Sequence, residues 1–301
     1  MSVIKSFSVG DGDMFYIKHN SDNFSIIDCY MDDSNKKAIV SEIKKESSAK
    51  GITRFISTHP DEDHLQGIKY LDEQTGIVNF YCVKNAAIKN DEETDDFKHY
   101  CSLRDGEHAY YVSEGCSRKW MNIGDEERGC AGINFKWPII TNSDFKEALS
   151  SVAEGEGFNN ISPIFTYSVE EGVTAMWMGD MEHDFLEKIK NQVAWGKIDI
   201  LFAPHHGRDS GKVSDDVLKK LDPYIIVIGE APSKFLNYYS GYNTIKQNSA
   251  GDILFDCSGD KVHVYVSEAD YDYDNSFLSN EGAYNSNFGY YLGSFTPKGA
   301  K

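Results

Sequence analysis

The residues with the greatest capacity for chemistry lie at residues 59–64, which read His-Pro-Asp-Glu-Asp-His. They follow an apolar, β-rich run at residues 52–58, so they predict a loop leaving the end of a strand. Such a loop can turn several side chains toward one point, and imidazole nitrogen with carboxylate oxygen suits zinc, manganese or iron(II). The alternative is a polar loop that caps a helix beginning at Leu65. Four candidate ligands favour the metal site, and they are His59, Asp61, Asp63 and His64.

Two more predicted strands end on ligand-type side chains. The apolar run at residues 174–178 leads into a Gly-Asp pair that ends at Asp180, where a carboxylate can bridge two metal ions. The run at residues 199–203 leads into a Pro-His-His-Gly turn, in which either His205 or His206 can be a ligand. Each feature alone is typical of an ordinary turn. Three such strand ends in one chain indicate a metal centre.

Taken together, these motifs resemble the metallo-β-lactamase superfamily. More narrowly, they resemble the hydrolase domain of ComEC-type DNA-uptake proteins and their stand-alone relatives, over residues 2–266. The motifs that carry the resemblance are Val9-Gly-Asp-Gly-Asp13, Ile26-Ile-Asp28, His59-x-Asp61-x-Asp63-His64, Asn159-Asn160-x-Ser162, Gly179-Asp180, Pro204-His-His-Gly207 and Gly251-Asp-Ile-Leu-Phe255.

The resemblance implies an α/β fold, a four-layer αββα sandwich with one or two Zn²⁺ or Mn²⁺ ions at a sheet edge. The implied ligands of one ion are Asp63, His64, Asp180 and either His205 or His206, and those of the other are His59, Asp61 and Asp180. By the same resemblance, Asp13 and Asp28 lie near the site, where we expect them to orient ligands through hydrogen bonds.

The implied chemistry is hydrolysis by a metal-bound hydroxide. Asp63 and Asp180 are the implied catalytic carboxylates, and Arg208 would offset the charge that develops on a phosphoryl group. The DNA-handling relatives favour a phosphodiesterase or nuclease that acts on a nucleic acid or a nucleotide. Hydrolysis of a lactone or ester is an alternative within the same fold.

The sequence also departs from the superfamily pattern. Asp61 replaces the usual middle histidine, which makes the site harder and manganese as plausible as zinc. A further histidine ligand between the first motif and Asp180 is not evident, and Trp137-Pro138 stands where relatives can carry His-Pro. The His-Pro element near the end of such domains is reduced to Leu-Asn-Tyr-Tyr at residues 236–239. These losses motivate a second hypothesis, a catalytically weakened interaction module.

The chain that must position these residues alternates short strands with helices. Helices are predicted at residues 33–50, 65–72, 184–192 and 214–220, and strands at residues 3–8, 15–18, 24–28, 52–58, 133–137, 161–168, 174–178, 199–203, 224–228, 252–255 and 261–266. Residues 1–268 are expected to form one hydrolase domain. Residues 269–301, rich in Tyr, Asn and Gly, are expected to pack on it or to contact a protein partner.

Charge and cysteine usage limit the partners of the 301-residue chain. Thirty Lys and Arg against 48 Asp and Glu give a net charge of −18, which argues against nonspecific clamping of a nucleic-acid backbone. A protein partner could deliver such a substrate, and analogy suggests an effector of a multi-protein system such as anti-phage defence. Six cysteines without a CxxC pair indicate reduced thiols, and no apolar run spans a bilayer. We therefore expect a cytoplasmic protein without membrane contact.

Overall fold

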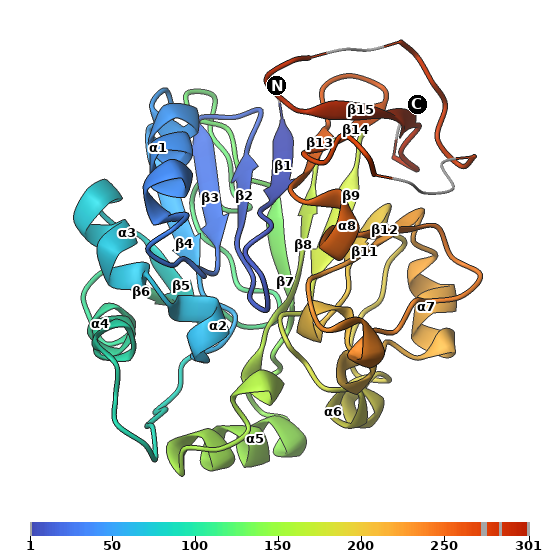
Figure 1. The fold of residues 1–301 in the computed structure, drawn as a ribbon. Helices are drawn as coiled ribbons and strands as arrows, with labels where there is room; N and C mark the ends of the chain where they lie inside the picture. Colours follow the sequence, from blue (N-terminus) through green and yellow to red (C-terminus); the bar gives the residue numbers. More distant parts are fainter. Residues whose placement is uncertain (1, 272–275, 283–284, 300–301) are drawn as a thin grey trace.

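Two β-sheets pack face to face with helices on both outer faces (Figure 1). The computed structural model describes residues 2–271, 276–282 and 285–299. This arrangement is the α/β, four-layer αββα sandwich that the sequence predicts, so the predicted fold class is confirmed. Among the described residues, no helix combines the length and the apolarity that crossing a membrane would require.

Within the described residues, the first sheet has nine strands and is antiparallel at one end and parallel at the other. In spatial order, its strands are β15 (Tyr290–Phe295), β14 (Val262–Val266), β13 (Ile253–Asp256), β1 (Val3–Ser6), β2 (Phe15–Lys18), β3 (Asn23–Ile27), β4 (Ile52–Ile56), β5 (Phe80–Cys82) and β6 (Ala109–Tyr111).

The second sheet has six strands, in the order β12 (Thr244–Lys246), β11 (Ile225–Ile228), β10 (Ile200–Phe202), β9 (Thr174–Trp177), β8 (Ile164–Ser168) and β7 (Ile133–Trp137). The longer helices are α1 (Lys36–Ser47), α3 (Ile68–Thr75), α4 (Asp95–Arg104), α5 (Ser143–Ala153), α6 (His183–Ile189) and α7 (Asp215–Leu221). Single helical turns are α2 (Glu62–Leu65), α8 (Gln247–Ala250), η1 (Phe158–Ile161), η2 (His205–Gly207), η3 (Asp209–Gly211) and η4 (Ser233–Phe235).

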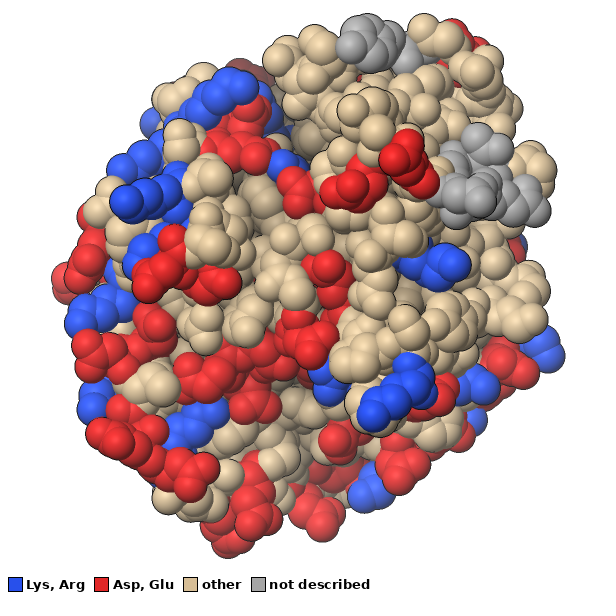
Figure 2. All heavy atoms as spheres, in the orientation of Figure 1, with Lys and Arg blue, Asp and Glu red and all other residues tan. Residues whose placement is uncertain are grey.

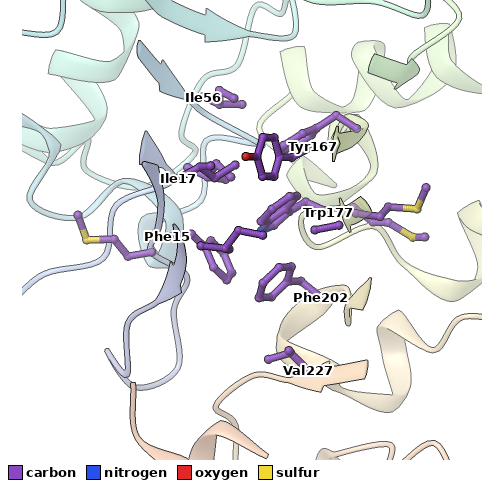
Figure 3. Packing of buried hydrophobic residues seen from close by; sticks show 14 of the residues in the cluster. Phe15, Ile17, Ile56, Tyr167, Trp177, Phe202 and Val227 are labelled. Atoms are coloured by element: carbon purple, nitrogen blue, oxygen red, sulfur yellow. The ribbon is translucent and has the colours of Figure 1, made fainter. Parts of the chain in front are cut away.

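Aromatic side chains fill the space between the two sheets (Figure 3). Trp177 of β9 stacks between Phe165 and Phe202, with ring centroids 5.5 and 4.6 Å away. Phe15 of β2 packs edge-on against Trp177 at 6.1 Å and against Phe202 at 5.0 Å. Trp177 therefore couples the two sheets just below the strand ends that carry the ligand-type residues, and its packing supports their positions.

Replacing Trp177 by Ala should lower the free energy of unfolding by about 3–5 kcal/mol, because it removes a stacked ring and leaves a cavity between the sheets. Urea denaturation followed by circular dichroism measures this loss. Ile140→Ala is the matched control, since Ile140 is a large apolar residue that is 62% exposed, and it should change stability by less than about 0.5 kcal/mol. Equal effects of the two substitutions would contradict this account of the core.

Most predicted elements are present with shifted ends, and several were missed. The helix predicted at residues 33–50 covers Lys36–Ser47, and the one predicted at residues 65–72 is divided into α2 and α3. The strands and α-helices that were not predicted are β5, β6, β12, β15, α4, α5 and α8. Three of these strands, β5, β6 and β12, have three residues each, which is too short for an alternating pattern to stand out.

The C-terminal segment, residues 269–301, extends the first sheet. Its strand β15 pairs antiparallel with β14, and half-buried Phe277, Phe288 and Tyr291 pack against the core. Residues 272–275, 283–284 and 300–301 of the segment lie outside the described residues. The described part thus contacts the core through β15 and these aromatic side chains. The division of the chain after residue 268 and the use of the segment for partner contact stay predictions.

Candidate metal centre

One edge of the sandwich collects the residues singled out by the sequence. Asp28 follows β3, residues 59–64 follow β4, Asp180 follows β9 and His206 follows β10. Asp13 precedes β2, which runs antiparallel to β3 and so begins at the same edge. Because β3 and β4 are parallel, as are β9 and β10, their carboxyl ends meet there, where α/β proteins commonly bind ligands.

At this edge two groups of side chains have ligand atoms that all lie within 4.8 Å of one another. One group is Asp13, His64, Asp180 and His206, and the other is His59, Asp63 and His64. We call the six residues of the two groups the strand-end cluster. His59, His64, Asp180 and His206 are almost completely buried, whereas the side chains of Asp63 and Asp13 are 34% and 15% exposed.

The three imidazoles of the cluster share one hydrogen-bonding pattern. In each ring Nδ1 has a hydrogen-bond partner, and in each ring Nε2 is buried without one. His64 Nδ1 lies 2.9 Å from Asp28 Oδ2, and His206 Nδ1 lies 3.2 Å from Asp13 Oδ1. Because a carboxylate can only accept, both Nδ1 atoms donate, and Nε2 is the atom of each ring that can bind a cation. Burial lowers the pKa of both rings, but the charges of Asp180 and of Asp28 or Asp13 raise it well above the ordinary value, so a cation would replace a proton at each Nε2.

Asp28 fixes two of these rings at once. It accepts hydrogen bonds from the Thr58 backbone N–H at 2.7 Å, from Thr58 Oγ1 at 2.6 Å and from His64 Nδ1. Since the Thr58 hydroxyl donates to Asp28, it accepts from His59 Nδ1, 3.0 Å away. Asp28 thus selects the tautomer of His64 directly and that of His59 through Thr58. The expected orienting roles of Asp13 and Asp28 agree with these contacts.

Asp180 lies between the histidines. Its Oδ1 is 3.1 Å from His64 Nε2, and its Oδ2 is 3.1 Å from His206 Nε2. Asp63 Oδ2 approaches His206 Nε2 from the more open side, at 3.4 Å. Asp180 is thus within hydrogen-bond distance of both rings, but the angles at His64 Nε2, His206 Nε2 and Asp180 Oδ1 do not suit hydrogen bonds. The ligand atoms of these three residues instead lie within 4.8 Å of one another. An ion bound at about 2.1 Å needs donors roughly 3–4 Å apart, so these residues fit a divalent cation.

The charges of the cluster also suit a cation. Burial alone would raise the pKa of Asp63, but close contact with His206 and the charge of His64 hold this pKa at about 2. Burial opposes ionisation of Asp180 as well, and His206 and His64 keep its pKa well below the ordinary value. Both carboxylates are therefore ionised at neutral pH and place negative charge where the Nε2 atoms converge.

A glycine and a strained turn bring the segments this close. Gly179, at φ +52°, lets Asp180 approach β4: a side chain there would meet Ser162 Oγ at 2.6 Å and Thr58 Cβ at 2.8 Å. His205 and His206 have φ values of 55° and 54°, a left-handed conformation that costs roughly 1–2 kcal/mol per residue. Backbone strain of this kind is concentrated at functional sites, where the surrounding structure holds it.

Some residues predicted as ligands lie outside the strand-end cluster. Asp61 is at the N-terminus of α2, and its Oδ1 is 3.1 Å from Lys89 Nζ. His205 is at the margin: its Nε2 is 3.9 Å from Asp180 Oδ2, and its Nδ1 lies 2.9 Å from Ser210 Oγ. The turn thus brings His206 rather than His205 toward Asp180.

Arg208, the predicted catalytic cation, follows the same turn. Its Nε is buried without a hydrogen-bond partner. Burial lowers the pKa of the nearby His205, and the charges of His206 and Arg208 act in the same direction. The arginine therefore lies close enough to influence the margin of the cluster.

Sequence reasoning missed several residues that contact predicted ligands, among them Thr58, Lys89, Ser162 and Ser210. Thr58 and Ser162 lie next to or within recognised motifs, and Ser162 Oγ accepts a hydrogen bond from the Asp180 backbone N–H at 3.2 Å. Their hydroxyl groups beside ligand motifs were the available signal. Lys89 lies in a segment without any recognisable motif, so nothing in the sequence connects it with Asp61.

Comparison with known proteins finds only distant likenesses. No family model matches the sequence, and no curated protein matches it. Similar solved structures include CmlA, a diiron β-hydroxylase from Streptomyces venezuelae (TM-score 0.44, 10% identity, 76% of this chain and 44% of CmlA). Another is a β-lactamase from Chitinophaga pinensis (TM-score 0.35, 14% identity, 72% of this chain and 91% of that protein). The chain thus spans less than half the length of CmlA, and its function must be argued from the site.

Proposed function

We propose that this protein is a metal-dependent hydrolase that cleaves phosphodiester bonds with a Mn²⁺ or Zn²⁺ ion at the strand-end cluster. The observation that carries the proposal is the convergence of two Nε2 atoms, from His64 and His206, on the buried carboxylate of Asp180, each 3.1 Å away and without hydrogen-bond geometry. A third unpartnered Nε2, that of His59, belongs to the adjoining group with Asp63 and His64. Buried polar atoms without partners are costly, and a bound cation would satisfy those of His64, His206 and Asp180. When bound, the ion supplies Lewis-acid polarisation of the substrate and activation of water.

The protein's own side chains bind the ion, orient its ligands and contact the water and the substrate. His64, His206 and Asp180 are the proposed ligands, and Asp28 and Asp13 keep the imidazole rings oriented. Asp63 is more exposed than Asp180 and stays ionised at neutral pH, so it can accept a hydrogen bond from the attacking water. Arg208, beside His205, is the proposed partner of a phosphoryl oxygen.

The surface around the site bears on the choice of substrate. Figure 2 shows a band of acidic side chains across the middle of one face, over the region where α2 lies in Figure 1. A long polyanion would be repelled there, whereas a small phosphodiester would meet less of the band. We therefore propose a nucleotide-sized substrate, or a nucleic acid delivered by a protein partner. The C-terminal segment, where Tyr290 is 53% exposed, is the proposed surface for such a partner.

The proposal predicts turnover of a generic phosphodiester. Protein freed of metal and reloaded with Mn²⁺ or Zn²⁺ should hydrolyse bis-p-nitrophenyl phosphate, and removal of the ion by a chelator should abolish the activity, because the ion is required both for polarisation and for water activation. Release of p-nitrophenolate provides the measurement. A simple lactone, assayed in parallel, tests the alternative chemistry of the fold.

The outcomes of this assay are distinct. Turnover of the lactone alone would contradict the phosphodiesterase proposal while leaving a metal hydrolase. Metal binding without turnover of either substrate would favour the catalytically weakened interaction module. Activity that survives complete removal of the metal would place the chemistry elsewhere.

A further inference from the structure

We propose that the ammonium group of Lys89 takes the place of a second metal ion, so that the strand-end cluster holds a single divalent cation. The inference rests on the metal centre proposed above and specifies its composition. It is carried by the ion pair between Lys89 Nζ and Asp61 Oδ1, 3.1 Å apart, and by the hydrogen bonds of His64.

His64 limits how many ions the cluster can bind. The two groups of ligand atoms both include this residue. His64 Nδ1 donates to Asp28, so only the Nε2 lone pair of the ring remains for a metal. One lone pair binds one ion. His64 can therefore serve only one of the two groups at a time, and a second ion beside His59 would need further carboxylate donors.

Asp61 is the donor that a second ion would use. Asp61 lies two residues after His59 in the sequence. It nevertheless belongs to neither group of ligand atoms found among the described residues. Its Oδ1 instead contacts Lys89 Nζ. The lysine neutralises the carboxylate that would have attracted a second cation, and its own positive charge adds repulsion. His59 is then left with Asp63 as the one carboxylate of its group among the described residues.

Aromatic rings hold Lys89 in this position. The residue lies between β5 and α4, and its side chain is only 15% exposed. Its ammonium group lies 4.6 Å from the ring centroid of Phe158 and 5.3 Å from that of Phe97, both of which are buried. Aromatic faces attract a cation, and shielding from solvent strengthens the pair beyond a surface salt bridge. These contacts hold the positive charge of Lys89 next to Asp61.

The test is to count ions in wild-type protein and in Lys89→Met, which keeps an apolar chain over Phe158 and removes the charge. After equilibrium dialysis against Mn²⁺ and elemental analysis, wild type should hold about one ion per chain and the variant about two. The double variant Lys89→Met with Asp61→Asn should return to about one, because the released carboxylate is then absent. Circular dichroism checks that each variant is folded.

A matched control comes from the same segment. Lys84→Met also removes a lysine that lies over an aromatic ring, that of Tyr111 at 5.3 Å, but Lys84 is exposed and makes no contact with Asp61. It should keep about one ion per chain. Electron paramagnetic resonance of the Mn²⁺-loaded wild type provides a reading that needs no variant: the hyperfine pattern of an isolated ion is expected.

Two results would overturn the inference. One is a stoichiometry that stays at a single ion in Lys89→Met, and the other is a spin-coupled ion pair already present in wild type. Either result leaves the proposed hydrolase intact, because ion number is measured independently of turnover. Wild-type protein that binds no ion would instead remove the proposed metal centre itself, and this inference with it.

Discussion

Asp180→Asn is expected to lower kcat/KM for phosphodiester hydrolysis by about 10³-fold or more, which corresponds to roughly 4 kcal/mol of lost transition-state stabilisation. The substitution keeps the size of the side chain and removes the charge between His64 and His206. Without that charge the two imidazoles lose their shared carboxylate, so the affinity for the ion should fall together with the activity. Calorimetric titration with Mn²⁺ and the p-nitrophenolate assay measure the two losses separately.

Asp184→Asn is the matched control. Asp184 lies four residues further along the chain, is exposed in the first turn of α6 and is not part of the strand-end cluster. It should change activity and metal affinity by less than about twofold. If Asp180→Asn retained full activity with an unchanged metal affinity, the strand-end cluster would not be the active site.

Asp28→Asn should weaken metal binding by roughly 10–100-fold, although Asp28 is not itself a proposed ligand. An amide cannot accept all three hydrogen bonds that reach the carboxylate from Thr58 and His64, and its NH₂ group competes as a donor. The rings of His64 and His59 then lose the tautomer that leaves Nε2 free. The buried mismatch should also lower the free energy of unfolding by about 1–3 kcal/mol.

The positioning role has its own signature. Because the ligands themselves remain, activity of Asp28→Asn should recover in part at saturating Mn²⁺, whereas Asp180→Asn should not recover. Asp33→Asn, whose side chain is 93% exposed, is the control and should leave stability within about 0.5 kcal/mol of wild type. Unchanged metal affinity in Asp28→Asn would show that Asp28 only supports the fold.

The layers and the edge of the site could be predicted from the sequence because its motifs follow directly on apolar strands. The carboxyl ends of parallel strands meet at one edge, so residues 59–64, Asp180 and a histidine of the Pro-His-His-Gly turn could be expected to lie together. The choice between His205 and His206 could not be made, since it depends on two consecutive left-handed residues in one turn.

Other features were hidden for different physical reasons. The acidic run at residues 91–96 is compatible with a solvated loop or with the start of a helix, and the structure has the helix, because Thr94 caps α4 there by accepting from the Phe97 N–H. The pairing of Asp61 with Lys89 spans 28 positions through a segment without a periodic pattern. Strand β15 lies in a Tyr- and Gly-rich segment whose composition suggested no strand, and its sheet position is defined by pairing with β14.

The central claim, that the strand-end cluster binds a catalytic divalent ion, is tested most directly by metal analysis of ligand variants. After dialysis against Mn²⁺ or Zn²⁺, wild type should retain about one ion per chain, and the double variant His64→Ala with His206→Ala should retain almost none. His108→Ala, whose side chain is 54% exposed and outside the cluster, should bind like wild type. A wild-type protein without bound metal, or a double variant that keeps the full complement, would contradict the claim.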